Sequence, residues 1–234
     1  MKVLIVLSIL LFPLVILVLQ TSATSFTPNT FFVYNQTVKM VLPNGTIATI
    51  NEVILQRITE VFPNGSIIIN ETIYDVNQHY YIPPVIVIDN STFPQHLYYI
   101  PPSLLGKNVT RGRGELYFIN YSNGLYEYES KTSIQGVFIE FIMWVNSSGV
   151  AVKVQTLQIG ASLQLVSNAT AILWKTNYFN PSVPLPIFSG YTKANVVTAH
   201  LNGGYYYYFP EKMFKYILII GILAIILILL FRKR

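Results

Sequence analysis

Nine asparagines stand in the pattern Asn-X-Ser/Thr, which is the acceptor pattern for N-linked sugars. They are Asn35, Asn44, Asn64, Asn70, Asn90, Asn108, Asn120, Asn146 and Asn168. Random placement of the asparagines, serines and threonines in residues 24–210 would give roughly three such sequons. The excess predicts a glycosylated surface, and the alternative is that asparagine-rich turns create the pattern by accident.

Side chains that could bind a metal or act as catalysts are scattered along the chain. The three histidines, His79, His96 and His200, do not have the spacing of a metal motif. The two aspartates, Asp75 and Asp89, lie outside any motif resembling that of aspartic proteases. There is no nucleophile elbow and no phosphate-binding loop. The sequence therefore predicts no catalytic residue, no metal site and no cofactor.

Three glutamates give the one arrangement that hydrolysis could use. Glu127 and Glu129 share a face of a predicted strand, and Glu140 is a potential neighbour. Two carboxyl groups close together are the catalytic pair of most glycosidases. On a sheet face exposed to water, however, glutamates are usually solvated and have no catalytic role.

Two other segments suggest ligand binding, each with a simpler explanation. Residues 111–115 (RGRGE) could bind an anion or a sugar acid, but an exposed turn is the favoured interpretation. The aromatic run 205–209 could stack on carbohydrate. Its position just before an apolar segment favours an aromatic belt at a membrane interface.

The charge distribution argues against nucleic acid as a partner. The net charge is +5, yet residues 24–210 hold nine lysines and arginines against nine aspartates and glutamates. The excess of positive charge lies near the two ends of the chain, beside an apolar run at each end. Such a distribution is typical of the basic residues that flank membrane-spanning segments and not of a nucleic-acid surface. The absence of cysteine excludes disulfides and thiolate chemistry.

In composition alone, the chain resembles surface glycoproteins of thermoacidophilic crenarchaea. Charged residues are only 11% of the chain, and amides, hydroxyls and tyrosines carry most of the polarity between the ends. At an external pH of about 2 to 3, carboxyl groups with pKa values near 4 would be largely neutral. The resemblance implies a surface that stays soluble without ionised carboxylates.

Turn signals divide the middle of the chain into short β-rich runs. They occur at 43–45, 63–65, 122–124, 146–149 and 202–204. Asn-Gly suits the two positive-φ positions of a type I′ hairpin turn. The clearest predicted hairpins are 116–128 and 137–159, and hairpin tips are expected near Asn44, Asn64, Asn123 and Ser147. The expected fold class is all-β, with antiparallel hairpins in a sandwich-like arrangement, plus one C-terminal transmembrane helix.

The expected organisation follows from repeats and prolines. Residues 24–76 form an N-terminal β-hairpin region, because the run 41–54 is echoed at 61–73. Residues 77–111 form an irregular, proline-rich linker, since Pro-Pro pairs interrupt strands. Residues 112–209 form a β-sandwich-like domain.

The two ends predict targeting and anchoring. Residues 1–23 read as a signal peptide, with an uncleaved signal anchor as the alternative. Residues 214–231 are the predicted transmembrane helix, and 232–234 form a cytoplasmic basic tail. The expected localisation is the cell membrane, crossed once, with the ectodomain outside and the C-terminus in the cytoplasm.

The leading hypothesis is a non-enzymatic, N-glycosylated cell-surface protein with a structural, adhesive or envelope-docking role. Its expected partners are the membrane and an S-layer or other envelope protein, and no nucleic acid. The first alternative is an accessory or ligand-binding subunit of a membrane complex. The second alternative is an acid-active extracellular hydrolase.

Overall fold

The computed structural model describes residues 26–42, 44–111, 114–134, 136–160, 165–194, 196–200 and 206–210. The predicted signal peptide (1–23), transmembrane helix (214–231) and basic tail (232–234) lie outside the described residues. Within the described ranges, no helix has the length and apolar character needed to cross a membrane.

Nearly all regular structure in the described ranges is β-strand, as the sequence predicts. The strands are β1 (Phe31–Val41), β2 (Ile47–Val61), β3 (Ser66–Asp75), β4 (Tyr80–Asn90), β5 (Val109–Arg111), β6 (Gly114–Ser122), β7 (Leu125–Ile134), β8 (Val137–Val145), β9 (Ala151–Ile159), β10 (Leu165–Thr176), β11 (Thr192–Lys193), β12 (Val196–His200) and β13 (Tyr206–Pro210). The 3-10 turn η1 (Pro102–Leu104) precedes β5.

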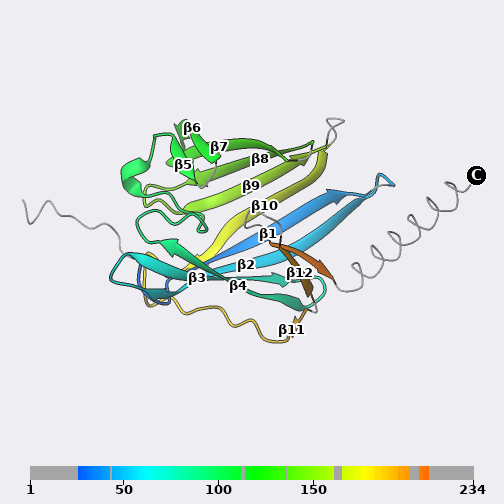
Figure 1. The fold of residues 1–234 in the computed structure, drawn as a ribbon, viewed down its shortest axis with the longest axis horizontal. Helices are drawn as coiled ribbons and strands as arrows, with labels where there is room; N and C mark the ends of the chain where they lie inside the picture. Colours follow the sequence, from blue (N-terminus) through cyan, green and yellow to red (C-terminus); the bar gives the residue numbers. More distant parts are fainter. Residues whose placement is uncertain are drawn as a thin grey trace, which may run out of the picture.

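Eleven of these strands form one sheet in the order β11-β4-β3-β2-β1-β10-β9-β8-β7-β6-β5. Every pairing is antiparallel except that of β11 with β4. β12 and β13 pair separately. Figure 1 shows that the large sheet is strongly curved, with β6–β10 on one side and β2–β4 on the other.

The sheet order departs from the predicted sandwich and from two separate β regions. β1 pairs with β10 as well as with β2, so strands from 24–76 and from 112–209 lie side by side in a single sheet. The sequence carries no local signal for this distant pairing. The alternation of apolar and polar residues along a strand is the same whichever strand lies beside it.

β4 also differs from the prediction, because it lies within the segment 77–111, which the sequence predicts to be irregular. Its Pro83-Pro84 pair lies at a register shift, where Glu71 pairs with Val85 and Ile73 pairs with Ile82. A bulge tolerates proline because no ladder hydrogen bond is required from its nitrogen. Irregular structure does follow β4, from residue 91 to residue 108.

The inner face of the curved sheet packs against residues 91–108, here called the inner segment. Phe32 and Tyr34 of β1 share one buried cluster with Leu97 and Ile100 of this segment and with Val154 of β9. The cluster reaches strands on both sides of β1, so the inner segment takes the place that a second sheet would occupy in a sandwich. The apolar surface buried between the sheet and the inner segment provides most of the hydrophobic stabilisation of the fold.

The outer face of β1 and β2 is covered locally by residues 183–188, here called the strap. Phe31 and Val33, which alternate with the inward-facing Phe32 and Tyr34, pack with Leu185 of the strap in a second buried cluster. In Figure 1 the segment after β10 runs along the outer side of β3 and β4 towards β11. The first four residues of β1 are therefore all buried, two of them on each face of the sheet.

Candidate glycosylation sites and the polar network

Four of the nine sequon asparagines occupy turns that begin or end strands. Asn44 and Asn64 lie at the tips of the β1–β2 and β2–β3 hairpins, Asn90 ends β4, and Asn146 begins the turn between β8 and β9. Asn44, Asn64 and Asn90 are exposed, and Asn146 is half-buried. The predicted tips near Asn44, Asn64, Asn123 and Ser147 are all turns in the structure.

These four asparagines share one local geometry. Each side-chain Oδ1 accepts the backbone N–H of the residue two positions later, which is the Ser or Thr of the sequon. The acceptor-to-donor distances are 3.0 Å to Thr46, 3.0 Å to Ser66, 2.8 Å to Thr92 and 3.0 Å to Ser148. Among the described residues, no hydrogen bond is made by the four Nδ2 atoms, the atoms that N-glycosylation modifies.

In the two threonine sequons of this group, the hydroxyl joins the same arrangement. Thr46 Oγ1 donates to Asn44 Oδ1 at 2.7 Å, and Thr92 Oγ1 donates to Asn90 Oδ1 at 2.6 Å. The hydroxyl that defines the sequon therefore contacts the carboxamide that N-glycosylation would modify. This geometry fixes the side chain while its amide nitrogen stays available.

Four further sequon asparagines, Asn35, Asn70, Asn120 and Asn168, lie within strands. Asn35, Asn70 and Asn168 alternate with inward-facing core residues and so project from the outer face of the sheet. Asn120 reaches the same face through a register shift after Phe118, which places it opposite Glu127. Asn120 Nδ2 donates to Glu127 Oε2 at 3.1 Å, so its modifiable atom is engaged. Asn168 is held through its Oδ1, which accepts from Gln155 Nε2 at 3.2 Å. The ninth, Asn108, is exposed and accepts the N–H of Phe118 at 3.0 Å.

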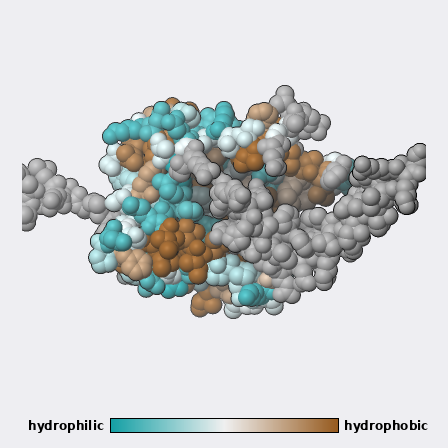
Figure 2. Space-filling model, viewed as in Figure 1, coloured by the Kyte–Doolittle hydropathy of each residue, from teal (hydrophilic) through white to brown (hydrophobic). Residues whose placement is uncertain are grey.

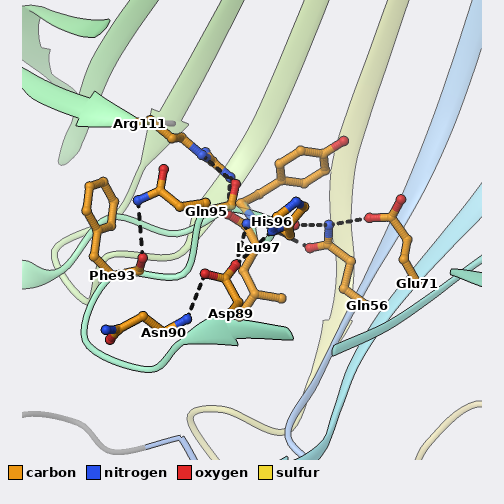
Figure 3. A network of polar contacts seen from close by, with 10 residues as sticks. Gln56, Glu71, Asp89, Asn90, Phe93, Gln95, His96, Leu97 and Arg111 are labelled. Carbon is orange, nitrogen blue, oxygen red and sulfur yellow. Dashed lines mark hydrogen bonds and ion pairs between the residues drawn. The ribbon is translucent and has the colours of Figure 1, made fainter. Parts of the chain in front are cut away.

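A polar network at the inner face ties the inner segment to the sheet (Figure 3). Its centre is Gln56 of β2, which is 1% exposed. Gln56 Nε2 donates to Glu71 Oε2 at 2.7 Å and to the His96 carbonyl oxygen at 3.0 Å. Gln56 Oε1 accepts the backbone N–H of Tyr98 at 3.4 Å. A buried amide with partners on both sides fixes the path of the inner segment.

Asp89 and Arg111 hold the same segment from its flanks. Asp89 Oδ2 accepts both the backbone N–H and Nδ1 of His96, each at 2.9 Å. Arg111 Nε donates to the carbonyl oxygen of Gln95 at 2.8 Å, and its Nη2 donates to that of Leu97 at 2.5 Å. Arg111 is thus a structural anchor. Residues 112 and 113, in the segment for which the sequence favours an exposed turn over anion binding, lie outside the described residues.

Burial raises the pKa of two glutamates on the inner face, whereas hydrogen bonds lower that of a nearby aspartate. It raises the pKa of Glu71, and the hydrogen bond from Gln56 only partly opposes this. It also raises the pKa of Glu52, which accepts a 2.7 Å hydrogen bond from Gln36. Burial acts in the same direction on Asp89, but the hydrogen bonds from His96 and the Asn90 N–H outweigh it and lower the Asp89 pKa. Glu52 and Glu71 are therefore easier to protonate than an exposed glutamate.

The predicted grouping of Glu129 and Glu140 is present on the outer face. Both carboxylates contact the ammonium of Lys131, with 3.1 Å between Lys131 Nζ and Glu140 Oε1. Hydrogen bonding to Lys131 and to Glu140 lowers the pKa of Glu129, and the pKa of Lys131 is raised in turn. Glu127 instead accepts from Asn120. This arrangement is a surface ion-pair network, of a kind that adds little stability.

The other candidates from the sequence are not brought together. His79 Nδ1 donates to the Val76 carbonyl oxygen in the turn before β4, while His96 contacts Asp89. Asp75 is buried and accepts the N–H of Gln78. No group of three metal-ligating side chains occurs among the described residues. Of the aromatic run 205–209, residues 206–209 lie in β13.

Apolar side chains also remain exposed on the surface. Figure 2 shows separate hydrophobic patches set among hydrophilic surface on the visible face. Ile88 is 74% exposed and Ile86 is 66% exposed, and both lie on the outer face of β4. Single exposed apolar residues are common, but two on one short stretch of strand are a candidate contact surface.

Comparisons with known proteins give distant similarities only. No protein-family model matches this sequence, and no curated protein does. A crystal structure of an AttH-like protein from Nitrosomonas europaea aligns at 13% identity and a TM-score of 0.27, covering 66% of this chain. The alignment spans about half, 53%, of that protein. A LolA superfamily protein from the same organism aligns at 10% identity and a TM-score of 0.20, covering 65% of this chain and 87% of that one. Similarities at this level carry no argument about function.

Proposed function

We propose that this protein is a non-enzymatic, N-glycosylated, single-pass cell-surface protein with a structural, adhesive or envelope-docking role. The observation that carries the proposal is the shared geometry of Asn44, Asn64, Asn90 and Asn146. Each presents an amide nitrogen free of hydrogen bonds to the described residues, and each is oriented through Oδ1 by its own sequon. Sugars at these turns would keep the surface hydrated.

The membrane part of the proposal rests on sequence. Residues 1–23 would direct export, 214–231 would anchor the chain, and the basic residues 232–234 would stay in the cytoplasm. The ectodomain would then stand outside the cell, on the side of the membrane where the chain would meet the glycosylation machinery.

A non-enzymatic role is supported by how the ionisable groups are used. Glu71 accepts from Gln56 beneath the inner segment, and Asp89 holds His96. Glu129 and Glu140 share Lys131, so their charges are balanced by a partner. Each of these groups has a structural partner that accounts for its position.

The buried Glu52 and Glu71 give a physical reason to connect this protein with the thermoacidophile surface proteins that it resembles in composition. Burial raises both pKa values, so acidification protonates two carboxyl groups that are costly to keep charged in the folded protein. We therefore extend the proposal to an acidic external medium.

Protease treatment of right-side-out membrane vesicles tests the topology. With a tag on the C-terminus, external protease should remove the ectodomain and leave the tag protected inside. Removal of the tag along with the ectodomain would contradict the proposed orientation. The same digestion after detergent permeabilisation is the control, because it must remove both.

The second candidate function is an accessory or ligand-binding subunit of a membrane complex. The exposed Ile86 and Ile88 favour it, since they could pack on a partner. Pull-down from solubilised native membranes separates the two candidates. Co-purification of an S-layer protein supports the first, and co-purification of a transporter or an oxidase supports the second.

A further inference from the structure

A groove lies between the outer face of β2–β4 and the strap, with a volume of about 330 Å³. Its lining includes Leu55, Arg57, Asn70, Thr72, Tyr74 and Phe188. Asn70 and Thr72 are the first and last residues of the sequon Asn70-Glu71-Thr72. The groove is thus built around a predicted acceptor of sugar.

The sequence places Asn70 on a wet face, because it alternates with Ile69 and Ile73. The structure keeps it on the outer face, opposite the buried Ile69, but the strap narrows the space above it. Asn70 is half-buried, and no hydrogen bond joins its side chain to another described residue. Any group attached to Asn70 Nδ2 must begin inside the groove.

The lining suits a sugar. Tyr74 stacks on Phe188 of the strap, with ring centroids 4.2 Å apart and an interplanar angle of 17°. Such apolar walls pack against the C–H faces of a pyranose ring, while the hydroxyl of Thr72 and the guanidinium of Arg57 offer hydrogen bonds to its oxygens. Arg57 Nη2 is already oriented by Asn29 Oδ1 at 2.5 Å.

We propose that the groove holds the first sugars of an N-linked glycan on Asn70, and that this glycan fastens the strap to the sheet. The proposal rests on the proposed function, since it requires a glycosylated protein. Attachment joins Asn70 Nδ2 to the anomeric carbon of a lipid-phosphate-linked oligosaccharide. The bond from that carbon to the phosphate oxygen breaks, and the lipid phosphate leaves together with one Nδ2 proton.

The order of events follows from the position of the strap in the chain. Thr72 is only 9% exposed in the folded protein, so a transferase cannot reach the whole sequon there. The strap lies far C-terminal of Asn70, and its docking is a non-local contact that forms late. Glycosylation of Asn70 therefore precedes docking of the strap, which then closes over the sugar.

Two substitutions of one residue give a matched test in the full-length protein. Thr72→Ser keeps the sequon, whereas Thr72→Val removes it and leaves Asn70 in place. Both are produced in an archaeal host that performs N-glycosylation and in a host that does not. Intact-glycopeptide mass spectrometry measures occupancy at Asn70, and hydrogen–deuterium exchange measures the opening of the strap.

In the glycosylating host, we expect strap amides to exchange about tenfold faster in Thr72→Val than in Thr72→Ser. In the other host the two variants should exchange alike. Asn70→Gln should reproduce the fast exchange, whereas Asn35→Gln, at an open site on the same face, should not.

Equal exchange of the two variants, with Asn70 of Thr72→Ser occupied, would show that the glycan lies outside the groove. An empty Asn70 beside occupied turn sequons would also overturn the inference, while leaving the proposed function intact. Nine empty sequons would overturn both. A difference that persists in the non-glycosylating host would assign the effect to the side chain and reject the glycan as its cause.

Discussion

Gly149, in the turn between β8 and β9, lies directly against the backbone of Ile100 in the inner segment. A Cβ at position 149 would stand 2.1 Å from the Ile100 carbonyl oxygen. The backbone N–H of Ile100 donates to the Gly149 carbonyl oxygen at 2.8 Å, and that of Ala151 donates to the Tyr98 carbonyl oxygen at 3.0 Å. The inner segment is thus joined by backbone hydrogen bonds to a hairpin at the far side of the sheet.

We expect Gly149→Ala to destabilise the protein by more than about 2 kcal/mol, because it combines a positive φ of 86° with a backbone clash. Gly124→Ala is the control, since Gly124 has a φ of 78° and open space around it. Chemical denaturation measures both. Equal losses for the two variants would show that the contact with Ile100 contributes nothing.

The second prediction concerns pH. Burial raises the pKa of Glu71 in the folded state, so its contribution to stability is fully present below about 4.5, the value of a free glutamate. That contribution is lost as the pH rises through the folded-state pKa. Glu71→Gln mimics the protonated form, keeps an oxygen for Gln56, and keeps the sequon at Asn70.

Glu71→Gln should therefore be more stable than the wild type at pH 7, with an advantage that shrinks at pH 4. Urea unfolding at the two pH values measures this, and Glu60→Gln, at an exposed position of β2, is the control. An advantage that is the same at both pH values, or a loss at both, would contradict the assigned effect of burial.

The inner segment should also depend on the buried Tyr128 hydroxyl. It accepts the N–H of Gly106 at 2.8 Å and donates to the Leu104 carbonyl oxygen at 3.3 Å. Tyr128→Phe should cost about 1–3 kcal/mol, since it leaves these groups without that partner. Tyr121→Phe, at an exposed position on the neighbouring strand, should cost almost nothing in the same thermal or urea unfolding. Equal stability of the two variants would contradict the anchoring role.

Local turn chemistry allowed the hairpins to be predicted from sequence. Asn123 and Gly124 have φ values of 53° and 78°, as the Asn-Gly signal for a type I′ turn requires. What the sequence could not provide is the non-local part. The pairing of β1 with β10 and the strand through Pro83-Pro84 depend on partners chosen in the folded sheet.

The same distinction holds for the sites. The sequons are visible as a pattern, and alternation with Ile69 correctly assigns Asn70 to the outer face. The strap that covers it comes from a distant, proline-rich segment with no pairing signal. Gln56, the centre of the polar network, carries no motif, because its partners Glu71 and His96 meet it only through the tertiary fold.

The fourth prediction concerns Asn120, whose Nδ2 donates to Glu127 within the β6–β7 hairpin. Such a hairpin forms within microseconds, well before distant contacts such as that of the strap. The engaged amide should therefore be glycosylated less fully than the turn sequons, and Glu127→Ala should raise its occupancy. Quantitative glycopeptide analysis measures the change, with Asn44 as the internal reference. Unchanged occupancy at Asn120 in the variant would show that this hydrogen bond does not protect it.

The central claim is tested most directly by site-resolved mass mapping of the protein purified from its native membranes. Enzymatic release in heavy-oxygen water would mark sites accessible to the enzyme, and intact glycopeptides would identify the others. The account predicts sugar at Asn44, Asn64, Asn90 and Asn146. Unmodified peptide masses at all four of these turns would contradict it.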